Sequence, residues 1–274
     1  MLTKGLSSFL EGDRSIALRA LLLASLSRQK CVLKNYPRSL DGKALPLILQ
    51  QLGAQIDTDD SVLTIHQRRY CPTKLELHAQ NSGTTARLLL GLLSQLPFPT
   101  KLNGDNSLQK RPFKRIVKPL SQMGARIFSK NEMLPLEIFP AQLHGIQYEL
   151  PMASAQVKSA LMFAGWLAES GVTVLSGKID SRDHLEKLAI WLNLPINIAD
   201  TRLEISPAAA FPSFDLTIPL DISSAAFLIA AAILCGQKIK LDNVLLNPTR
   251  LGFAHILQQA GVRFEMDIRS QFPE

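Results

Sequence analysis

The chain has 274 residues, of which 46% are apolar, 19% are charged and 6% are aromatic, a balance typical of a soluble globular enzyme or binding protein. Its formal net charge of +7 favours anionic partners. The longest apolar run covers residues 225–235 and is shorter than the roughly 18 to 20 residues needed to cross a bilayer, so we expect no membrane span.

The sequence repeats itself about every 70 residues, and each copy begins with a polar loop that leads into an Ala/Leu-rich helix. The density of apolar residues predicts these helices over residues 16–27, 86–96, 157–169 and 225–234. We expect a strand, a second helix and two more strands after each of them. Three of the second helices end at a glycine suited to a left-handed C-cap, and these are Gly53, Gly124 and Gly261. The third copy has Leu192-Asn193-Leu194 instead.

A unit of this length is longer than a solenoid repeat of roughly 20 to 50 residues and is closer to a small α/β module. One such module cannot bury both of its helices by itself. We therefore predict an α/β fold made of pseudo-repeats of a helix-strand-helix-strand-strand unit, with the helices packed inward and the sheets outward around a shared axis.

The polar loops are candidate anion sites, because the first turn of a helix exposes unpaired N–H groups and the positive end of the helix dipole. They occupy residues 12–15, 81–85, 154–156 and 221–224. The second is the clearest, since Gly83 allows a ligand to approach the backbone while Ser82, Thr84 and Thr85 add hydroxyl groups. The alternative is that such residues, Ser15 among them, only cap the helices. Recurrence in every copy favours binding, with four turns converging on one ligand.

Composition and spacing also indicate what this protein does not bind. Lys and Arg are spread along the chain and aromatic side chains are few, so we expect no nucleic acid partner. Small phosphorylated or carboxylated ligands fit better, because basic residues such as Arg14, Arg87 and Lys158 lie at or near the polar loops.

No metal, disulfide framework or export is expected. The three cysteines, Cys31, Cys71 and Cys235, have no metal-ligand spacing and are predicted to be buried small apolar residues. The five histidines contain no His-x-x-x-His pair. Residues 1–5 lack an apolar signal core and a transit pattern, so a cytoplasmic protein is expected.

Six ordered motifs extend over nearly the whole chain, and the polar loops are parts of them. They cover residues 12–23, 81–87, 104–112, 154–160, 181–186, and 221–227 with its continuation at 246–250. In these motifs the sequence resembles the 5-enolpyruvylshikimate-3-phosphate synthase family. The resemblance implies two similar domains, each of three units around a pseudo-threefold axis. It also implies transfer of the enolpyruvyl group of phosphoenolpyruvate to the 5-hydroxyl of shikimate 3-phosphate, without a metal or organic cofactor.

The resemblance implies that shikimate 3-phosphate is held by residues of three motifs. Ser15 and Arg19 match residues that hold this substrate. Ser154 matches a ligand of its phosphate group, and Ser181 with Arg182 matches a further phosphate contact.

Four further positions match residues of the family that contact phosphoenolpyruvate or both substrates. Gly83 and Arg111 fall on phosphoenolpyruvate contacts, and a planar guanidinium suits a two-point grip on a carboxylate or phosphate. Gln156 matches a contact to both substrates. Arg14 stands where the family has a lysine that touches both, and it keeps the charge while losing an ammonium that can give up a proton. The alternative for Arg111 is a solvated arginine at the surface, and the alternative for Gln156 is a residue on the surface of its helix.

The length of the chain predicts an incomplete, C-terminally truncated member. Residues 14–215 would form one three-unit domain, whereas residues 1–13 and 216–274 would form one of the three repeats of a second. We predict no catalytic residue, because the general base implied by the resemblance would lie in the absent part. The chain would then be inactive alone or completed by a second chain that supplies the missing repeats. The alternatives are a non-catalytic remnant that binds shikimate 3-phosphate and a UDP-N-acetylglucosamine enolpyruvyl transferase, whose reactive cysteine has no counterpart in residues 105–111.

Overall fold

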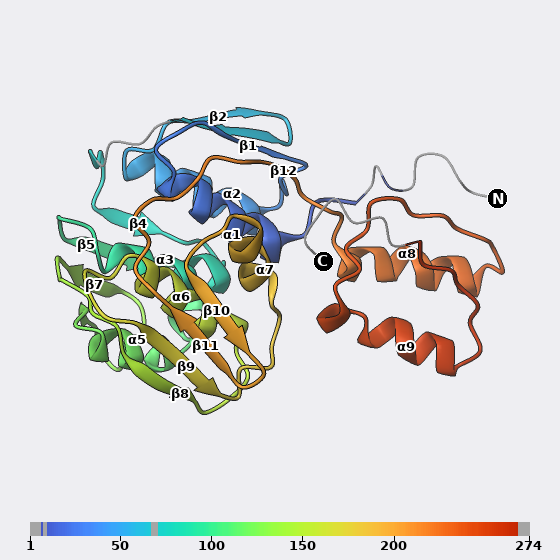
Figure 1. The fold of residues 1–274 in the computed structure, drawn as a ribbon. Helices are drawn as coiled ribbons and strands as arrows, with labels where there is room; N and C mark the ends of the chain where they lie inside the picture. The colour runs from blue at the N-terminus through green and yellow to red at the C-terminus, as the bar shows by residue number, and fades with distance from the viewer. Residues whose placement is uncertain (1–6, 8–9, 67–70, 268–274) are drawn as a thin grey trace.

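The computed structural model describes residues 7, 10–66 and 71–267. These residues form a large lobe, which carries three sheets, and a small lobe built around two helices (Figure 1). Within this part of the chain, no helix is long and apolar enough to cross a membrane.

The large lobe contains the predicted order of helix, strand, helix, strand and strand three times. The first unit consists of α1 (Arg14–Leu26), β1 (Cys31–Lys34), α2 (Leu40–Gln51), β2 (Ile56–Asp59) and β3 (Val62–Ile65). The second consists of α3 (Gly83–Leu93), β5 (Thr100–Asn103), α4 (Asn106–Gln109), α5 (Lys114–Gln122), β6 (Arg126–Phe128) and β7 (Leu136–Phe139). The third consists of α6 (Ala155–Trp166), β9 (Thr173–Gly177), α7 (His184–Trp191), β10 (Ile196–Ala199) and β11 (Arg202–Ile205). The prediction of an α/β fold built from repeated units is confirmed.

Each sheet has a fourth strand, which the predicted unit lacked. These strands are β4 (Glu76–His78), β8 (Gln147–Leu150) and β12 (Asp215–Thr217), and they pair in parallel with β5, β9 and β1. The sheet orders are β12-β1-β3-β2, β4-β5-β7-β6 and β10-β11-β9-β8. The predicted unit was wrong in this respect because the added strands are three or four residues long and bury one side chain each, which leaves no alternation to detect.

The first helices of the three units lie inside the lobe and the sheets lie outside, as predicted (Figure 1). Almost every side chain of α1 and α6 is buried. α3 and α6 approach so closely that a Cβ atom at Gly91 would lie 2.3 Å from the carbonyl oxygen of Ala160. Gly91 therefore permits the packing of these two helices.

The ends of the helices follow their capping residues. Gly53, Gly124 and Gly261 have φ values of 101°, 102° and 86°, as expected for left-handed C-caps, and Asn193 takes the same role in the third unit with φ 51°. The first helices begin two or three residues earlier than predicted, because the capping side chain precedes the apolar run.

The small lobe contains α8 (Ile222–Leu234), the short 3-10 helix η2 (Pro248–Arg250) and α9 (Gly252–Gln259). Its apolar core is small and consists of Leu10, Leu220, Ile222, Ala225, Leu251 and Ala254. The boundary predicted between residues 215 and 216 falls inside β12, which belongs to a sheet of the large lobe.

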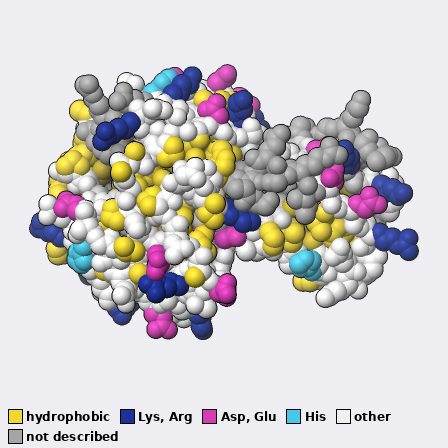
Figure 2. Space-filling view, viewed as in Figure 1, with side chains coloured by type: hydrophobic (Ala, Val, Ile, Leu, Met, Phe, Trp, Pro, Cys, Tyr) yellow, Lys and Arg dark blue, Asp and Glu magenta, His cyan; other side chains and the backbone are white. Residues whose placement is uncertain are grey.

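α8 is apolar apart from Ser223 and Ser224 in its first turn, yet only Ile222 and Ala225 are buried. Phe227 is 80% exposed and Leu234 is 86% exposed. Apolar side chains gather on this lobe in the view of Figure 2. An exposed apolar surface of this kind is uncommon on a soluble globular protein.

The expectation that all three cysteines are buried was wrong. Cys31 in β1 is buried, and burial raises the pKa of its thiol. Cys71 and Cys235 are exposed, because they lie outside the helices and strands, beyond the reach of the core.

Candidate functional site

The helices that follow the four polar loops, α1, α3, α6 and α8, each begin with a side chain that accepts a hydrogen bond from the first turn. Asp13 accepts from Ile16 in α1, Ser82 from Thr85 in α3, Ser154 from Val157 in α6 and Asp221 from Ser223 in α8. The cap of α1 is therefore Asp13, and the alternative that Ser15 is an N-cap was wrong. Ser15 lies in the first turn itself, where its hydroxyl is available to other groups.

Arg19 joins the N-terminal turns of α1 and α6. Its Nε donates to Ser159 Oγ at 3.0 Å, Nη1 donates to Ser15 Oγ at 2.8 Å, and Nη2 donates to the carbonyl oxygen of Ala155 at 3.1 Å. Arg19 is 1% exposed, and burial lowers the pKa of this guanidinium to about 10, so it stays charged at neutral pH. The structure thus places Arg19 beneath the predicted site, with its donors directed at the protein.

Gln156 joins the N-terminal turns of α6 and α3. Its Nε2 donates to Thr84 Oγ1 at 2.9 Å, and its Oε1 accepts from Arg87 Nη1 at 3.2 Å. Arg87 also lies over the ring of Phe113, 5.0 Å from the centroid. Burial lowers the pKa of Arg87, and the charges of Arg111 and Arg115 lower it further. The three first turns of the large lobe are therefore linked by side chains.

A pocket of about 290 Å³ opens at the N-terminus of α6. Four predicted substrate contacts line it together, and these are Ser154, Gln156, Ser181 and Arg182. Burial lowers the pKa of Arg182, and the positive charge of Arg250 lowers it further, while Asp13 and Asp221 act against this. A helix N-terminus, hydroxyl groups and a guanidinium on one wall form a site for a phosphate or carboxylate.

Gly83 and Arg111 come together beside the first turn of α3. A Cβ atom at Gly83 would lie 2.8 Å from Arg87 Nη1 and 3.3 Å from Arg111 Nη1, so glycine here lets both guanidinium groups lie close to the backbone. Arg111 is exposed and donates to Asn81 Oδ1 at 3.1 Å. Two guanidinium groups beside a helix N-terminus form a second anion-binding region.

The structure separates Arg14 from the α6 pocket. Its Nη1 contacts Asp41 Oδ2 of α2 at 2.9 Å, and its side chain is 51% exposed. In this arrangement the guanidinium points along the surface, and an exposed pair of this kind holds it only weakly.

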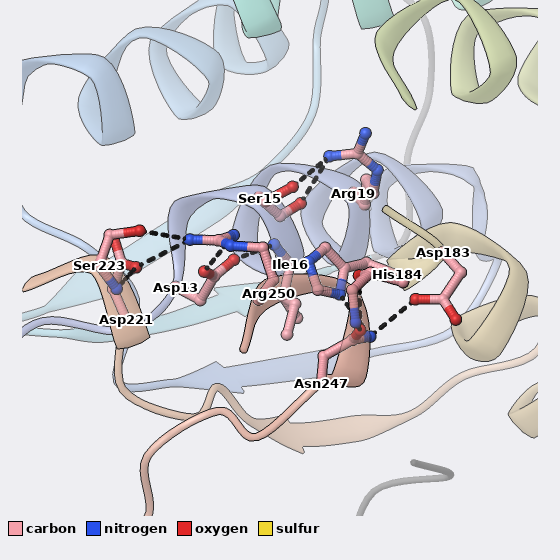
Figure 3. A network of polar contacts seen from close by, with 11 residues as sticks. Asp13, Ser15, Ile16, Arg19, Asp183, His184, Asp221, Ser223, Asn247 and Arg250 are labelled. Carbon is pink, nitrogen blue, oxygen red and sulfur yellow. Dashed lines mark hydrogen bonds and ion pairs between the residues drawn. The ribbon is translucent and has the colours of Figure 1, made fainter. Parts of the chain in front are cut away.

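A network not assigned from the sequence joins the small lobe to α1 and α7 (Figure 3). Arg250 Nη1 contacts Asp13 Oδ2 at 3.2 Å, and its Nη2 contacts Asp221 Oδ1 at 3.3 Å. Asn247 donates to Asp183 Oδ1 at 2.7 Å. One guanidinium thus bridges the N-cap carboxylates of α1 and α8. The residues of this network lie in the motifs at 12–23, 181–186, 221–227 and 246–250, and those motifs were the sequence signal for it.

A larger hollow of about 530 Å³ lies elsewhere, around Gln50, Asp57 and His66. It adjoins the C-terminal end of α2, where a helix exposes carbonyl groups instead of amides, so it does not suit an anion. Across the described residues, no group of three or more His, Cys, Asp or Glu side chains could hold a metal ion.

Fold and site together define a repeat-built α/β protein whose first helices bring polar and cationic side chains together at linked N-termini. The chain belongs to the EPSP synthase (3-phosphoshikimate 1-carboxyvinyltransferase) family, whose sequence model matches residues 9–272.

Relatives and solved structures agree with this family. The 3-phosphoshikimate 1-carboxyvinyltransferase of Thermotoga neapolitana is 38% identical over 261 residues, covering 94% of this chain and 62% of the relative. That of Coxiella burnetii strain CbuG_Q212 is 41% identical over 263 residues, covering 93% and 60%. EPSP synthase from Acinetobacter baumannii superimposes with a TM-score of 0.84 at 33% identity, over 92% of this chain and 58% of that one. The chain thus spans about 60% of the length of the curated relatives it matches.

Proposed function

We propose that this chain holds shikimate 3-phosphate and phosphoenolpyruvate for transfer of the enolpyruvyl group to the 5-hydroxyl of shikimate 3-phosphate. The observation that carries this proposal is the convergence of Ser154, Gln156, Ser181 and Arg182 on one pocket at the N-terminus of α6. Family membership supports it, because the relatives bear the name of this activity.

Two anions are to be held close together, and the site has two positive regions for them. The amides of the first turn of α6, with Ser154, Ser181 and Arg182, would hold the phosphate of shikimate 3-phosphate. Gly83 and Arg111, with Arg87 beside them, would hold phosphoenolpyruvate. Gln156 lies between the two regions and is bonded to the α3 side.

In such a reaction the protein first has to overcome the repulsion between its substrates. Fixed amides and guanidinium groups do this, and they also stabilise charge that develops on the phosphate as it leaves. Ser15 and Arg19 would support the shikimate side from α1. Arg14 would have to turn from Asp41 to reach either substrate. We assign no catalytic acid or base within this chain.

We propose that a second chain supplies further repeat units and covers the apolar face of α8. The exposure of Phe227 and Leu234 supports this, as does the greater length of the relatives. The alternative function is binding of shikimate 3-phosphate without catalysis. A cytoplasmic location is also proposed, since free, exposed cysteines such as Cys71 and Cys235 suit a reducing compartment.

Two measurements on the purified chain test these proposals. We expect calorimetric titration to show binding of shikimate 3-phosphate, and Arg182→Ala to weaken it about tenfold or more, because a charge-assisted hydrogen bond is lost. Lys101→Ala, an exposed change in β5, serves as the control and should leave binding unaltered. The absence of binding in the unaltered chain would refute both the transferase and the binding-only function.

The second measurement is release of phosphate from the two substrates together. We expect none from the chain alone. Substantial turnover by the chain alone would show that no second chain is required and that an acid or base has been overlooked among its residues.

A further inference from the structure

A buried ion pair that has no assigned role lies directly behind the α6 pocket. Lys158 of α6 pairs with Glu186 of α7, and the two side chains are 3% and 5% exposed. Neither residue lines the pocket. Charged side chains are seldom buried this deeply, because removal from water costs several kcal/mol per ion.

Lys158 is attached to the loop that carries Ser181 and Arg182. Its Nζ donates to the carbonyl oxygen of Ile179 at 2.9 Å, and the hydroxyl of Ser181 donates to the same oxygen at 3.3 Å. The carbonyl oxygen of Ile179 therefore accepts hydrogen bonds from both the Lys158 ammonium and the Ser181 hydroxyl. The loop cannot shift at Ile179 without disturbing the ion pair.

The negative charge of Glu186 offsets the buried positive charge of Lys158. It also acts on a second buried cation, Arg19. Its charge is the largest influence that opposes the effect of burial on the pKa of Arg19. Its second oxygen, Oε2, is buried without a hydrogen-bond partner among the described residues. The carboxylate thus pairs directly with the ammonium of Lys158 and attracts the charge of Arg19.

The energetics of such a pair favour a role in geometry over a role in stability. The cost of removing both ions from water offsets most of their attraction, so apolar side chains of similar volume often give an equally stable protein. An ammonium nevertheless fixes the carbonyl that it contacts, because its hydrogen bond is charge-assisted and shielded from water.

We propose that Lys158 and Glu186 are positioning residues, which hold the Ser181–Arg182 loop against the N-terminus of α6 so that the pocket takes a phosphate monoester. This inference rests on the proposed function of the pocket. It adds two residues, neither of which would touch the substrate, to the machinery that binds shikimate 3-phosphate.

The test compares the unaltered chain with the double variant Lys158→Met/Glu186→Leu, in which the buried charges are replaced together. We expect its urea unfolding midpoint to fall by less than that of the Leu45→Ala variant, because the two paired charges leave together and only the attraction between Glu186 and Arg19 is lost. Its Kd for shikimate 3-phosphate should rise about tenfold or more, because the loop is no longer held. Exchange of the amide hydrogens of residues 179–182 should become faster in the absence of ligand.

Leu45→Ala is the matched control, since Leu45 is fully buried in α2, outside the pocket. It should lower the unfolding midpoint and leave both the Kd and the exchange of residues 179–182 unchanged. Should the double variant fold too poorly to assay, Glu186→Gln keeps the shape and is expected to change the same two quantities less.

An unchanged Kd together with unchanged exchange in a folded variant would overturn the inference. If the unaltered chain fails to bind shikimate 3-phosphate, the proposed function fails and exchange alone decides the role of the pair. Equal losses of affinity in Leu45→Ala and in the double variant would show that the pair affects binding only through the stability of the fold.

Discussion

α1 and α8 begin in the same manner and differ in what covers them. Each follows an aspartate N-cap, Asp13 or Asp221, and each continues as an apolar helix. α1 is enclosed by its neighbours, whereas α8 leaves Phe227 and Leu234 in solvent. The same sequence pattern therefore produces an apolar helix that is buried only where other repeat units surround it. The large lobe provides that ring, and the small lobe supplies only α9.

The strongest test of this comparison places a charge on α3, which is enclosed like α1, and on α8. Leu89→Asp, in the interior of α3, should lower the free energy of unfolding by about 4 kcal/mol or more, because a buried carboxylate lacks a partner. Phe227→Asp on α8 should change it by no more than about 0.5 kcal/mol. Urea unfolding measures both values. A large loss from Phe227→Asp would mean that the face of α8 is already covered in solution.

The second test concerns the two arginines at the start of α1. Arg19→Met should cost about 3 to 5 kcal/mol of unfolding free energy, since Ser159 and the Ala155 carbonyl lose their buried donor. Arg14→Met is the matched control on the same helix, and its exposed pair with Asp41 should contribute about 1 kcal/mol or less. Similar losses from both variants would show that the α1–α6 link is not the stabilising contact.

The third test inserts a methyl group at a glycine in each lobe. Gly91→Ala should destabilise the chain by about 1 to 3 kcal/mol, because the new atom meets the Ala160 carbonyl. Gly252→Ala in α9 meets nothing within 4 Å and should stabilise by about 0.4 to 1 kcal/mol by restricting the unfolded chain. Thermal unfolding gives both signs. A tolerated Gly91→Ala would show that α3 and α6 pack less closely than described.

The smallest effect concerns a carboxylate near the α3 region of the site. A hydrogen bond from the Asn81 side chain, followed by one from the Leu108 amide, lowers the pKa of Asp105. A carboxylate whose pKa is lower in the folded chain than in the unfolded chain stabilises the fold at pH values above its unfolded-state pKa. This stabilisation is lost as the pH falls through the folded-state pKa. Asn81→Ala should therefore move the NMR titration of Asp105 to higher pH. An unmoved titration would leave the backbone donors and the charge of Arg111 as the causes.

The sequence allowed prediction of the repeated unit and of the polar helix starts at which the candidate site residues lie. Caps such as Ser154 and glycines such as Gly124 specify helix ends through local chemistry, so they can be recognised in the sequence alone. The strands β4, β8 and β12 were missed because pairing with a distant partner defines them.

The partners of the site's side chains could not be predicted in the same way. Gln156 was placed in the site by its motif, but its contacts with Thr84 and Arg87 come from another helix. Lys158 and Glu186 belong to different motifs, and only the packing of α6 against the α7 region makes them a pair. Contacts between units depend on the way in which the repeats close around their axis.

The pairing of β1 with β12 also determines when the large lobe can be completed during synthesis. Val32 lies in register with Asp215, so the first sheet to be made receives its edge strand only after all three units have emerged. Until then β1 has an open side, while the second and third sheets can form from contiguous segments. We expect the first unit to depend longest on chaperones as the chain is made, although it is translated first.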